Sequence, residues 1–137
     1  MTAPFLLDTC ACLWLISGEL PAAPLALLTE AFNNRAATYV SPITALEVGT
    51  LARKSRFRSH LSPQRWFETL LNMPGMMLAG MSAELLMESA LLPGGIQGDP
   101  YDRIIAATAR EYGYTVLTRD AALLAYAADG HLSAVEC

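Results

Sequence analysis

Charged residues and long apolar runs are both scarce in this chain. Only 16% of its 137 residues are charged and 53% are hydrophobic, a balance that excludes an intrinsically disordered chain. No stretch approaches the roughly 18–20 uninterrupted apolar residues that a membrane span needs. The first residues contain no basic segment and lead directly to Asp8, so a signal peptide is not expected. The length predicts a single domain, residues 1–137. Because neither a signal peptide nor a membrane span is expected, the protein is expected in the cytoplasm and without a membrane partner.

Cysteine is also scarce, with three residues in the chain. An odd number does not supply a complete set of disulfide pairs, which agrees with a reducing compartment. Cys10 and Cys12 lie two positions apart in one expected helix, so their side chains point to different sides. A metal site built from them is therefore not expected, and we interpret them as small buried hydrophobic residues.

Short apolar runs alternate with helical segments along the chain, and no repeat or low-complexity segment interrupts them. Strands are expected at 5–7, 38–40, 76–79, 115–118 and 132–135. Helices are expected at 9–17 (with Thr9 as the cap), 25–32, 43–54, 63–71, 82–92, 102–112 and 120–128. Strands that alternate with helices in this way predict an α/β domain with a mainly parallel sheet.

Four acids lie near the ends of these expected elements. Asp8 directly follows the first strand, and Asp120 lies two residues past Thr118 at the end of the fourth. Asp102 begins the helix that leads into the fourth strand, and Glu47 lies about one turn into the helix after the second. Open parallel sheets bind ligands beyond the carboxyl ends of their strands. Asp8 and Asp120 are thus expected at such a site, and the other two acids could converge on it.

Carboxylates gathered in one place repel each other, and burying them unpaired costs several kcal/mol each. Divalent cations remove that cost, and Mg²⁺ prefers oxygen ligands together with water and substrate phosphate. A bound metal ion can make hydroxide from water and neutralise charge on a phosphodiester. The pattern therefore suits phosphodiester hydrolysis without a nucleophilic Ser or Cys. Taken singly, each acid also has a plainer interpretation, as a helix cap or, for Glu47, as a side chain that faces water.

Basic residues are unevenly spread. The net charge of −4 argues mildly against a nucleic-acid partner, yet five of the nine Lys and Arg residues lie between positions 53 and 65. Four of these, which we call the basic stripe, are RNA-binding candidates: Arg53, Lys54, Arg56 and Arg58. A basic stripe beside an acidic centre suits a nucleic-acid substrate if the acids hold cations. The alternative interpretation is a solvated helix end and loop.

With these residues in view, the chain resembles the PIN-domain ribonucleases, and most of all the toxin (VapC-type) subunits of VapBC toxin–antitoxin pairs. The resemblance covers nearly the whole chain. Its most specific segment is GDPYDRIIAATA at 98–109. Shorter matching segments are LLDT at 6–9, SPITALE at 41–47 and LTRD at 117–120.

The resemblance implies a three-layer α/β/α sandwich whose central sheet has about five strands in the order 3-2-1-4-5, with an acidic pocket at its carboxyl edge. Four acids would bind Mg²⁺ or Mn²⁺ and act as the catalytic groups: Asp8, Glu47, Asp102 and Asp120. Asp99 would support them or bind the metal in some states, and Thr9 and Thr118 would orient ligands or water. Arg103 is expected to pair with a nearby acid rather than to bind RNA.

The activity that the resemblance implies is metal-dependent cleavage of structured RNA, either tRNA or ribosomal RNA, by the toxin of a toxin–antitoxin pair. A metal-activated water would leave a 5′-phosphate and a 3′-hydroxyl. The implied partners are an RNA substrate, a cognate antitoxin and a second copy of the chain. The apolar helices 25–32 and 43–52 could form the antitoxin's groove, or their faces could simply pack internally.

Three positions depart from the family pattern. Cys10 and Gln97 stand where members often carry His, and Leu46 stands where many carry Trp. None of the three replaces a carboxylate. The departures therefore put in doubt only a histidine contribution to proton transfer or substrate contact.

Other interpretations of the acids are a PIN-fold nuclease that acts on DNA or on RNA outside a toxin–antitoxin pair, and a catalytically silent binding module. The presence of every expected acid argues against the silent module. A haloacid-dehalogenase-like phosphatase would need a second Asp where Cys10 stands. A receiver domain would need an acidic pair near the first strand and a Lys after the last, and the sequence has neither.

Overall fold

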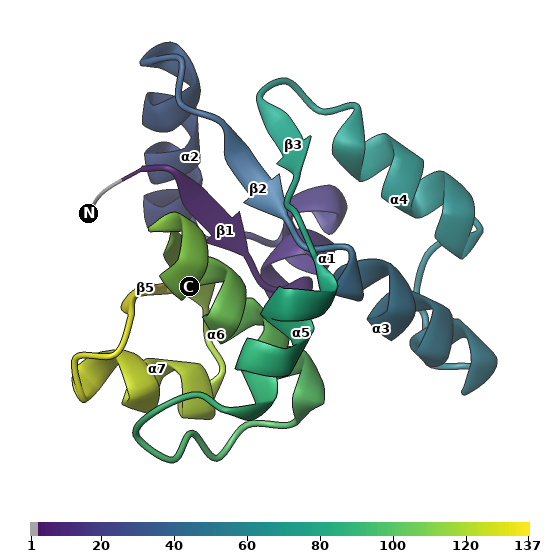
Figure 1. The fold of residues 1–137 in the computed structure, drawn as a ribbon. Helices are drawn as coiled ribbons and strands as arrows, with labels where there is room; N and C mark the ends of the chain where they lie inside the picture. Colours follow the sequence, from purple (N-terminus) through teal and green to yellow (C-terminus); the bar gives the residue numbers. More distant parts are fainter. Residues whose placement is uncertain (1–2) are drawn as a thin grey trace.

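The computed structural model describes residues 3–137. Met1 and Thr2 lie outside the described residues. They belong to the N-terminal segment for which no signal peptide is expected. The strands form one five-stranded sheet: β1 (Phe5–Leu7), β2 (Thr38–Val40), β3 (Met76–Leu78), β4 (Thr115–Thr118) and β5 (Ser133–Glu136). Their order is β3-β2-β1-β4-β5 and every neighbouring pair is parallel (Figure 1). The predicted strand order is confirmed.

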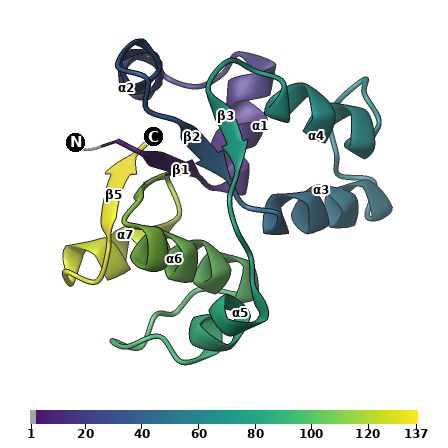
Figure 2. The same cartoon turned by 45° about the horizontal axis from the view of Figure 1, so that its top comes forward.

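Seven helices connect the described strands: α1 (Thr9–Ser17), α2 (Ala22–Asn33), α3 (Ile43–Arg53), α4 (Pro63–Leu71), α5 (Ala83–Ala90), α6 (Pro100–Tyr112) and α7 (Ala121–Ala128). Figure 2 shows α5, α6 and α7 gathered on one side of the sheet, with α1, α2 and α4 on the other. This arrangement is the predicted three-layer α/β/α sandwich.

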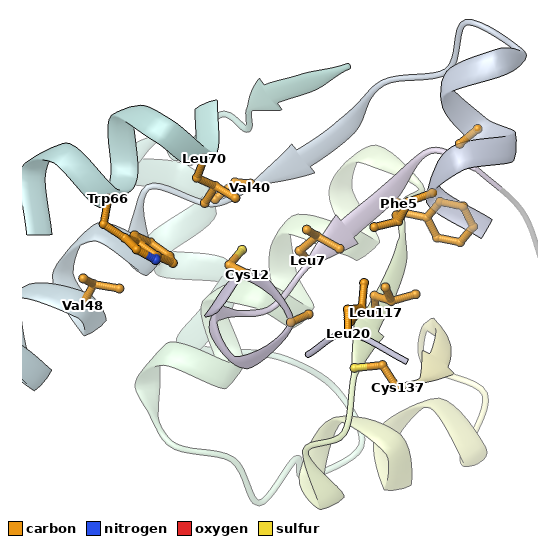
Figure 3. Packing of buried hydrophobic residues seen from close by; sticks show 13 residues of the cluster. Phe5, Leu7, Cys12, Leu20, Val40, Val48, Trp66, Leu70, Leu117 and Cys137 are labelled. Carbon is orange, nitrogen blue, oxygen red and sulfur yellow. The ribbon is translucent and has the colours of Figure 1, made fainter. Parts of the chain in front are cut away.

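Strand β1 divides the core into two parts because its successive side chains point to opposite faces of the sheet. Phe5 and Leu7 pack with the helices α1, α2 and α4, in the cluster drawn in Figure 3. Leu6 packs on the opposite face with residues of α5, α6 and α7, among them Ile105 and Leu123. All three strand residues are buried, as the central strand of a parallel sheet covered on both faces requires.

Polar side chains cap the N-termini of several helices. Ser62 and Ser82 accept hydrogen bonds from the backbone of α4 and α5. The cap of α1 is Asp8 rather than Thr9: its Oδ1 accepts from the Ala11 amide at 2.8 Å. The expectation that Thr9 caps this helix was wrong, because the carboxylate one residue earlier reaches the free amides and leaves the Thr9 hydroxyl for another partner.

Helices α1 and α2 follow each other after a sharp bend, and both contribute to the same buried cluster through residues such as Cys12 and Leu28. Gly18 ends α1 in the left-handed conformation, with φ 80°. In the described residues no single helix is long and apolar enough to cross a membrane, and only α1 and α2 taken together, bent by 91°, reach the length and composition of a span.

Candidate active site

The carboxyl ends of β1 and β4 meet at a pocket of about 410 Å³. Five acids from four separate parts of the chain line it: Asp8, Glu47, Asp99, Asp102 and Asp120. The parallel crossovers return each strand to the same edge of the sheet, so residues far apart in sequence arrive together. The structure therefore brings together the four acids expected as metal ligands and adds Asp99 to them.

Asp8 is both a helix cap and a member of the pocket. It is 6% exposed, and while Oδ1 accepts from the Ala11 amide, Oδ2 accepts a short hydrogen bond from the Thr118 hydroxyl. Burial raises the pKa of Asp8, the hydrogen bonds from Thr118 and Ala11 lower it in part, and the negative charge of Asp120 raises it again. Asp8 thus caps α1 and also lines the acidic pocket.

Glu47 is tied to α1 through two threonines. The Thr9 hydroxyl donates to Glu47 Oε1 at 2.7 Å, and Thr9 Oγ1 lies 3.0 Å from Thr44 Oγ1. Because the single hydroxyl hydrogen of Thr9 goes to Glu47, the buried Thr44 hydroxyl is the donor to Thr9. Burial raises the pKa of Glu47, the Thr9 hydrogen bond lowers it, and the charges of neighbouring acids, Asp99 first, raise it further.

Thr44 was not among the residues expected at the site. It lies three positions before Glu47 on α3, so both side chains are on the same face of the helix. That spacing is the one signal in the sequence that could have identified it, since a buried hydroxyl needs a hydrogen-bonding partner.

The start of α6 supplies two acids within one turn. Asp99 caps the helix, and its Oδ1 accepts from the Asp102 amide at 2.9 Å. Burial, followed by the charges of Asp120, Asp99 and Glu47, raises the pKa of Asp102 to about 7. Gly98 permits this turn because a Cβ there would lie 2.7 Å from Asp102 Cβ.

Arg103 supports the loop that precedes α6. Its side chain donates to the backbone carbonyls of Gly98, at 3.3 Å, and Ile96, at 3.5 Å. The expectation that Arg103 pairs with a nearby acid was therefore wrong, because the carbonyls of its own loop lie within reach and take its donors.

Asp120 caps α7 by accepting from the Leu123 amide at 3.0 Å, and its own amide donates to Thr118 Oγ1 at 2.9 Å. The Thr118 hydroxyl thus accepts from Asp120 and donates to Asp8, so it couples two acids that follow neighbouring strands. Thr118 is wholly buried, which limits the positions that either acid can adopt.

The basic stripe lies outside the pocket. All four of its side chains are exposed, at the end of α3 and in the loop that follows it. Phe57 within this loop packs edge-on against Trp66, with ring centroids 6.0 Å apart. Arg53 is six residues beyond Glu47 on α3, about 9 Å along the helix axis, so the stripe begins close to the acids without contacting them.

The three cysteines are free. Cys12 is wholly buried, as expected, but Cys10 is half-buried and lines the acidic pocket. Burial is the main cause of the raised pKa of the Cys10 thiol, and the charge of Asp8 adds to it. The interpretation of Cys10 as a buried hydrophobic residue was therefore only partly right.

The donor set of the pocket matches a hard divalent cation. Its side chains offer carboxylate and hydroxyl oxygens, the ligands that Mg²⁺ and Mn²⁺ prefer. Across residues 3–137, no three or more His, Cys, Asp or Glu side chains stand close enough to form a ready-made metal cage. Mg²⁺ does not require one, because it keeps several waters and binds through one or two carboxylates together with substrate phosphate.

Comparison with known proteins agrees with this architecture. The family model of the PIN domain matches residues 5–129. "Ribonuclease VapC22" of Mycobacterium tuberculosis is 30% identical over 81 residues, which are 59% of this chain and 61% of that protein. The chain thus matches less than two thirds of the length of this relative.

Two solved structures share the fold. VapBC2 from Rickettsia felis, bound to a DNA fragment from their promoter, aligns with a TM-score of 0.70 and 20% identity over 96% of this chain and 97% of that one. FitAB bound to the IR36 DNA fragment aligns with a TM-score of 0.53 and 21% identity over 97% of this chain and 94% of that one. The family match over residues 5–129, together with this shared fold, shows that the chain belongs to the PIN domain family.

Proposed function

We propose that the chain, as a single PIN domain over residues 1–137, is the Mg²⁺- or Mn²⁺-dependent endoribonuclease toxin of a type II toxin–antitoxin pair. Its substrate is structured RNA, either tRNA or ribosomal RNA. The observation that carries this proposal is the gathering of five carboxylates in one pocket at the carboxyl edge of the sheet. Among the described residues none of the five is in an ion pair, so their charges are available to a cation.

In this proposal four acids bind one or two metal ions: Asp8, Glu47, Asp102 and Asp120. When bound, the cation neutralises charge on the phosphodiester and lowers the pKa of water. Asp8 Oδ1 and Oδ2 each use one lone pair internally and keep another for the pocket. Glu47 Oε2 is free of the Thr9 contact that Oε1 makes.

The pKa of Asp102, raised to about 7, leaves much of this carboxyl group protonated near neutral pH. A cation favours the ionised carboxylate, so metal binding would release a proton from this side chain. Asp99 and Arg103 hold the turn on which Asp102 sits, and Thr9, Thr44 and Thr118 hold Glu47 and Asp8. These residues orient the acids that bind the ion.

The comparisons support the proposed activity and partner. The relative in Mycobacterium tuberculosis carries the name ribonuclease, and the two solved neighbours are the complexes VapBC2 and FitAB. By analogy with them, we include in the proposal a cognate antitoxin that covers apolar faces of α2 and α3, and a homodimer of the chain itself. Exposed Leu25 and Phe32 on α2 and Leu46 on α3 are apolar side chains that such partners would cover.

The activity is tested by incubating the purified protein with unfractionated tRNA, ribosomal RNA and duplex DNA, with Mg²⁺ or with EDTA. Asp102→Asn removes one acid of the pocket, and Asp129→Asn is the matched control because Asp129 is an exposed acid at the end of α7. We expect Mg²⁺-dependent RNA cleavage by the wild type and by Asp129→Asn, with 5′-phosphate products, and little cleavage by Asp102→Asn. Equal cleavage under all conditions would refute the metal mechanism.

The antitoxin is tested by co-expression with the protein encoded by the neighbouring open reading frame. A cognate antitoxin should co-purify with the chain and suppress both growth arrest and RNA cleavage. Cleavage that continues unchanged in a purified complex would contradict the toxin–antitoxin part of the proposal and leave the nuclease part standing.

A further inference from the structure

Arg119 is the one basic residue among those that line the acidic pocket. Its guanidinium does not approach the acids as a counter-ion. Instead Cζ lies 4.1 Å from the centroid of the Trp14 ring, in a cation–π contact. Within residues 3–137 the Arg119 side chain makes neither an ion pair nor a hydrogen bond, although it is exposed beside five carboxylates.

The backbone around Arg119 is held on both sides. Thr118, before it, is buried and hydrogen-bonded to Asp8, and its carbonyl accepts from the Cys137 amide at 2.9 Å. Asp120, after it, caps α7 and donates its amide to Thr118 Oγ1. The Arg119 Cα therefore has a defined position between two residues that belong to the acidic site.

Helix α1 provides the platform for the side chain. Cys10 lines the pocket, and Trp14 lies four residues later, so the two occupy one face of the helix. The backbone positions of these two residues are thus about 6 Å apart along the axis of α1. A cation–π contact uses the flat face of the guanidinium and leaves the N–H groups at its edge free for an acceptor.

We propose that Arg119, held on the ring of Trp14, binds a backbone phosphate of the RNA at the mouth of the acidic pocket. The inference rests on the proposed function, which brings RNA to this pocket. The planar fork of a guanidinium matches the oxygens of a phosphate, and stacking limits the rotamer freedom that binding would otherwise cost. Arg119 also gives a negatively charged substrate one attractive contact beside the acids. The basic stripe is farther away, at the C-terminal end of α3 and in the loop that follows it.

The test measures RNA binding rather than cleavage. Fluorescein-labelled unfractionated tRNA is titrated in the Asp102→Asn background with Mg²⁺, by fluorescence anisotropy, over a series of KCl concentrations. Arg119→Gln removes the charge, Arg119→Lys keeps the charge without the planar fork, and Trp14→Phe keeps a smaller ring. Arg35→Asn is the matched control: it removes one charge before β2, at the opposite edge of the sheet, and Asn tolerates the φ of 61° there.

We expect Arg119→Gln to weaken binding about 10- to 100-fold, the effect of losing one charged hydrogen-bond partner. The slope of log K against log salt should become shallower by about 0.7–0.9, since one phosphate is no longer neutralised by the protein. Arg119→Lys and Trp14→Phe should weaken binding less and keep the slope. Arg35→Asn should bind tRNA with the same affinity and the same salt slope as the Asp102→Asn protein.

Binding by Arg119→Gln with the affinity and salt slope of Arg35→Asn would overturn the inference. So would a change confined to Mn²⁺ affinity, measured by titration without RNA, because Arg119 would then serve the acids instead of the substrate. Failure of the proposed function gives a different result. If the wild type does not cleave RNA with Mg²⁺ but Arg119→Gln still binds RNA more weakly, the nuclease activity is refuted and the phosphate contact is confirmed.

Discussion

The hydroxyl of Thr118 donates a hydrogen bond to Asp8 Oδ2 across the boundary between β4 and β1. The two residues are 110 positions apart in the sequence and become neighbours because the chain places its first and fourth strands side by side at the centre of the sheet. Since the same hydroxyl also accepts from the Asp120 amide, one threonine sets the positions of two acids. The pairing of β1 with β4 thus sets the positions of Asp8 and Asp120, whereas Asp99 and Asp102 lie at the start of α6.

The Thr118 contact predicts a decrease in stability when the hydroxyl is removed. Thr118→Val keeps the shape of the side chain but leaves Asp8 Oδ2 and the Asp120 amide without a partner. We expect a decrease of about 1–3 kcal/mol in the free energy of unfolding, the usual cost of a buried unsatisfied polar group. Urea denaturation at neutral pH in EDTA measures it, with Thr118→Ser as the control that keeps the hydroxyl. Equal destabilisation by Val and Ser would show that the methyl group, and not the hydrogen bond, matters.

The two threonines beside Glu47 predict a graded effect on activity. Thr9→Val removes the donor to Glu47 and should lower Mn²⁺ affinity or cleavage about 10- to 100-fold, as removal of a group that orients a metal ligand does. Thr44→Val acts only through Thr9, so its effect should be smaller. Thr44→Ser should restore the wild-type value, because it keeps the donor. If Thr44→Val lowers stability and leaves metal affinity and cleavage unchanged, Thr44 has only a structural role.

The raised pKa values predict how pH affects the metal-free protein. Asp102, with a pKa of about 7, and Asp8 and Glu47, with raised pKa values, bind protons more tightly in the folded state than in the unfolded state. Their protonation stabilises the fold fully below about pH 4, the range of unfolded carboxyls, and this stabilisation is lost as pH rises through the folded pKa values.

In EDTA, the urea concentration at the midpoint of unfolding should therefore decrease as the pH is raised from about 5 to about 8. This decrease should be smaller for Asp102→Asn, because asparagine cannot ionise. For Asp129→Asn it should equal the wild-type decrease. Saturating Mg²⁺ should oppose the fall, because a bound cation stabilises the ionised acids and adds binding free energy to the folded state. A midpoint that rises over this range for the wild type relative to Asp102→Asn would contradict the assigned pKa shift.

The residues alone indicated the α/β class and four of the acids, whereas the strand order came from the resemblance to a family. The reason is physical. Periodicity and turn residues show where strands and helices lie, but short apolar strands such as Phe5–Leu7 and Thr38–Val40 carry no information about which neighbour they pair with. The rule that ligands bind at the carboxyl ends of parallel strands was enough to select Asp8 and Asp120.

What the sequence could not provide is the choice among local partners. Asp8 or Thr9 could equally have capped α1, and only the packed structure shows that Asp8 does so while Thr9 turns to Glu47. Helix α2 begins at Ala22, earlier than expected, because Pro24 sits in the first turn, where a helix amide needs no partner. In the sequence Arg119 is only one residue of the LTRD segment, since its contact with Trp14 depends on how α1 packs beside β4.

The close approach of Gly98 to Asp102 predicts that an added methyl group at this position disturbs the site. A Cβ at Gly98 would lie 2.7 Å from Asp102 Cβ, so Gly98→Ala must move either the loop or the start of α6. We expect lower Mn²⁺ affinity and slower RNA cleavage. Gly49→Ala is the matched control, because nothing lies within 4 Å of its added Cβ. Alanine inside a helix is also more favourable than glycine by about 0.5–1 kcal/mol, so this variant should fold. Wild-type activity in Gly98→Ala would show that the site tolerates movement of Asp102.

The basic stripe offers a last prediction, separate from that for Arg119. Replacing its four residues with Gln should weaken tRNA binding and make the salt slope shallower by up to about 3–4, at roughly 0.7–0.9 for each phosphate that the protein no longer neutralises. Because the stripe lies outside the acidic pocket, Mn²⁺ affinity measured without RNA should not change. The same anisotropy titration measures the slope, and circular dichroism verifies the fold of the variant. An unchanged slope would identify the stripe as a solvated helix end and loop, and would leave Arg119 as the principal phosphate contact near the acids.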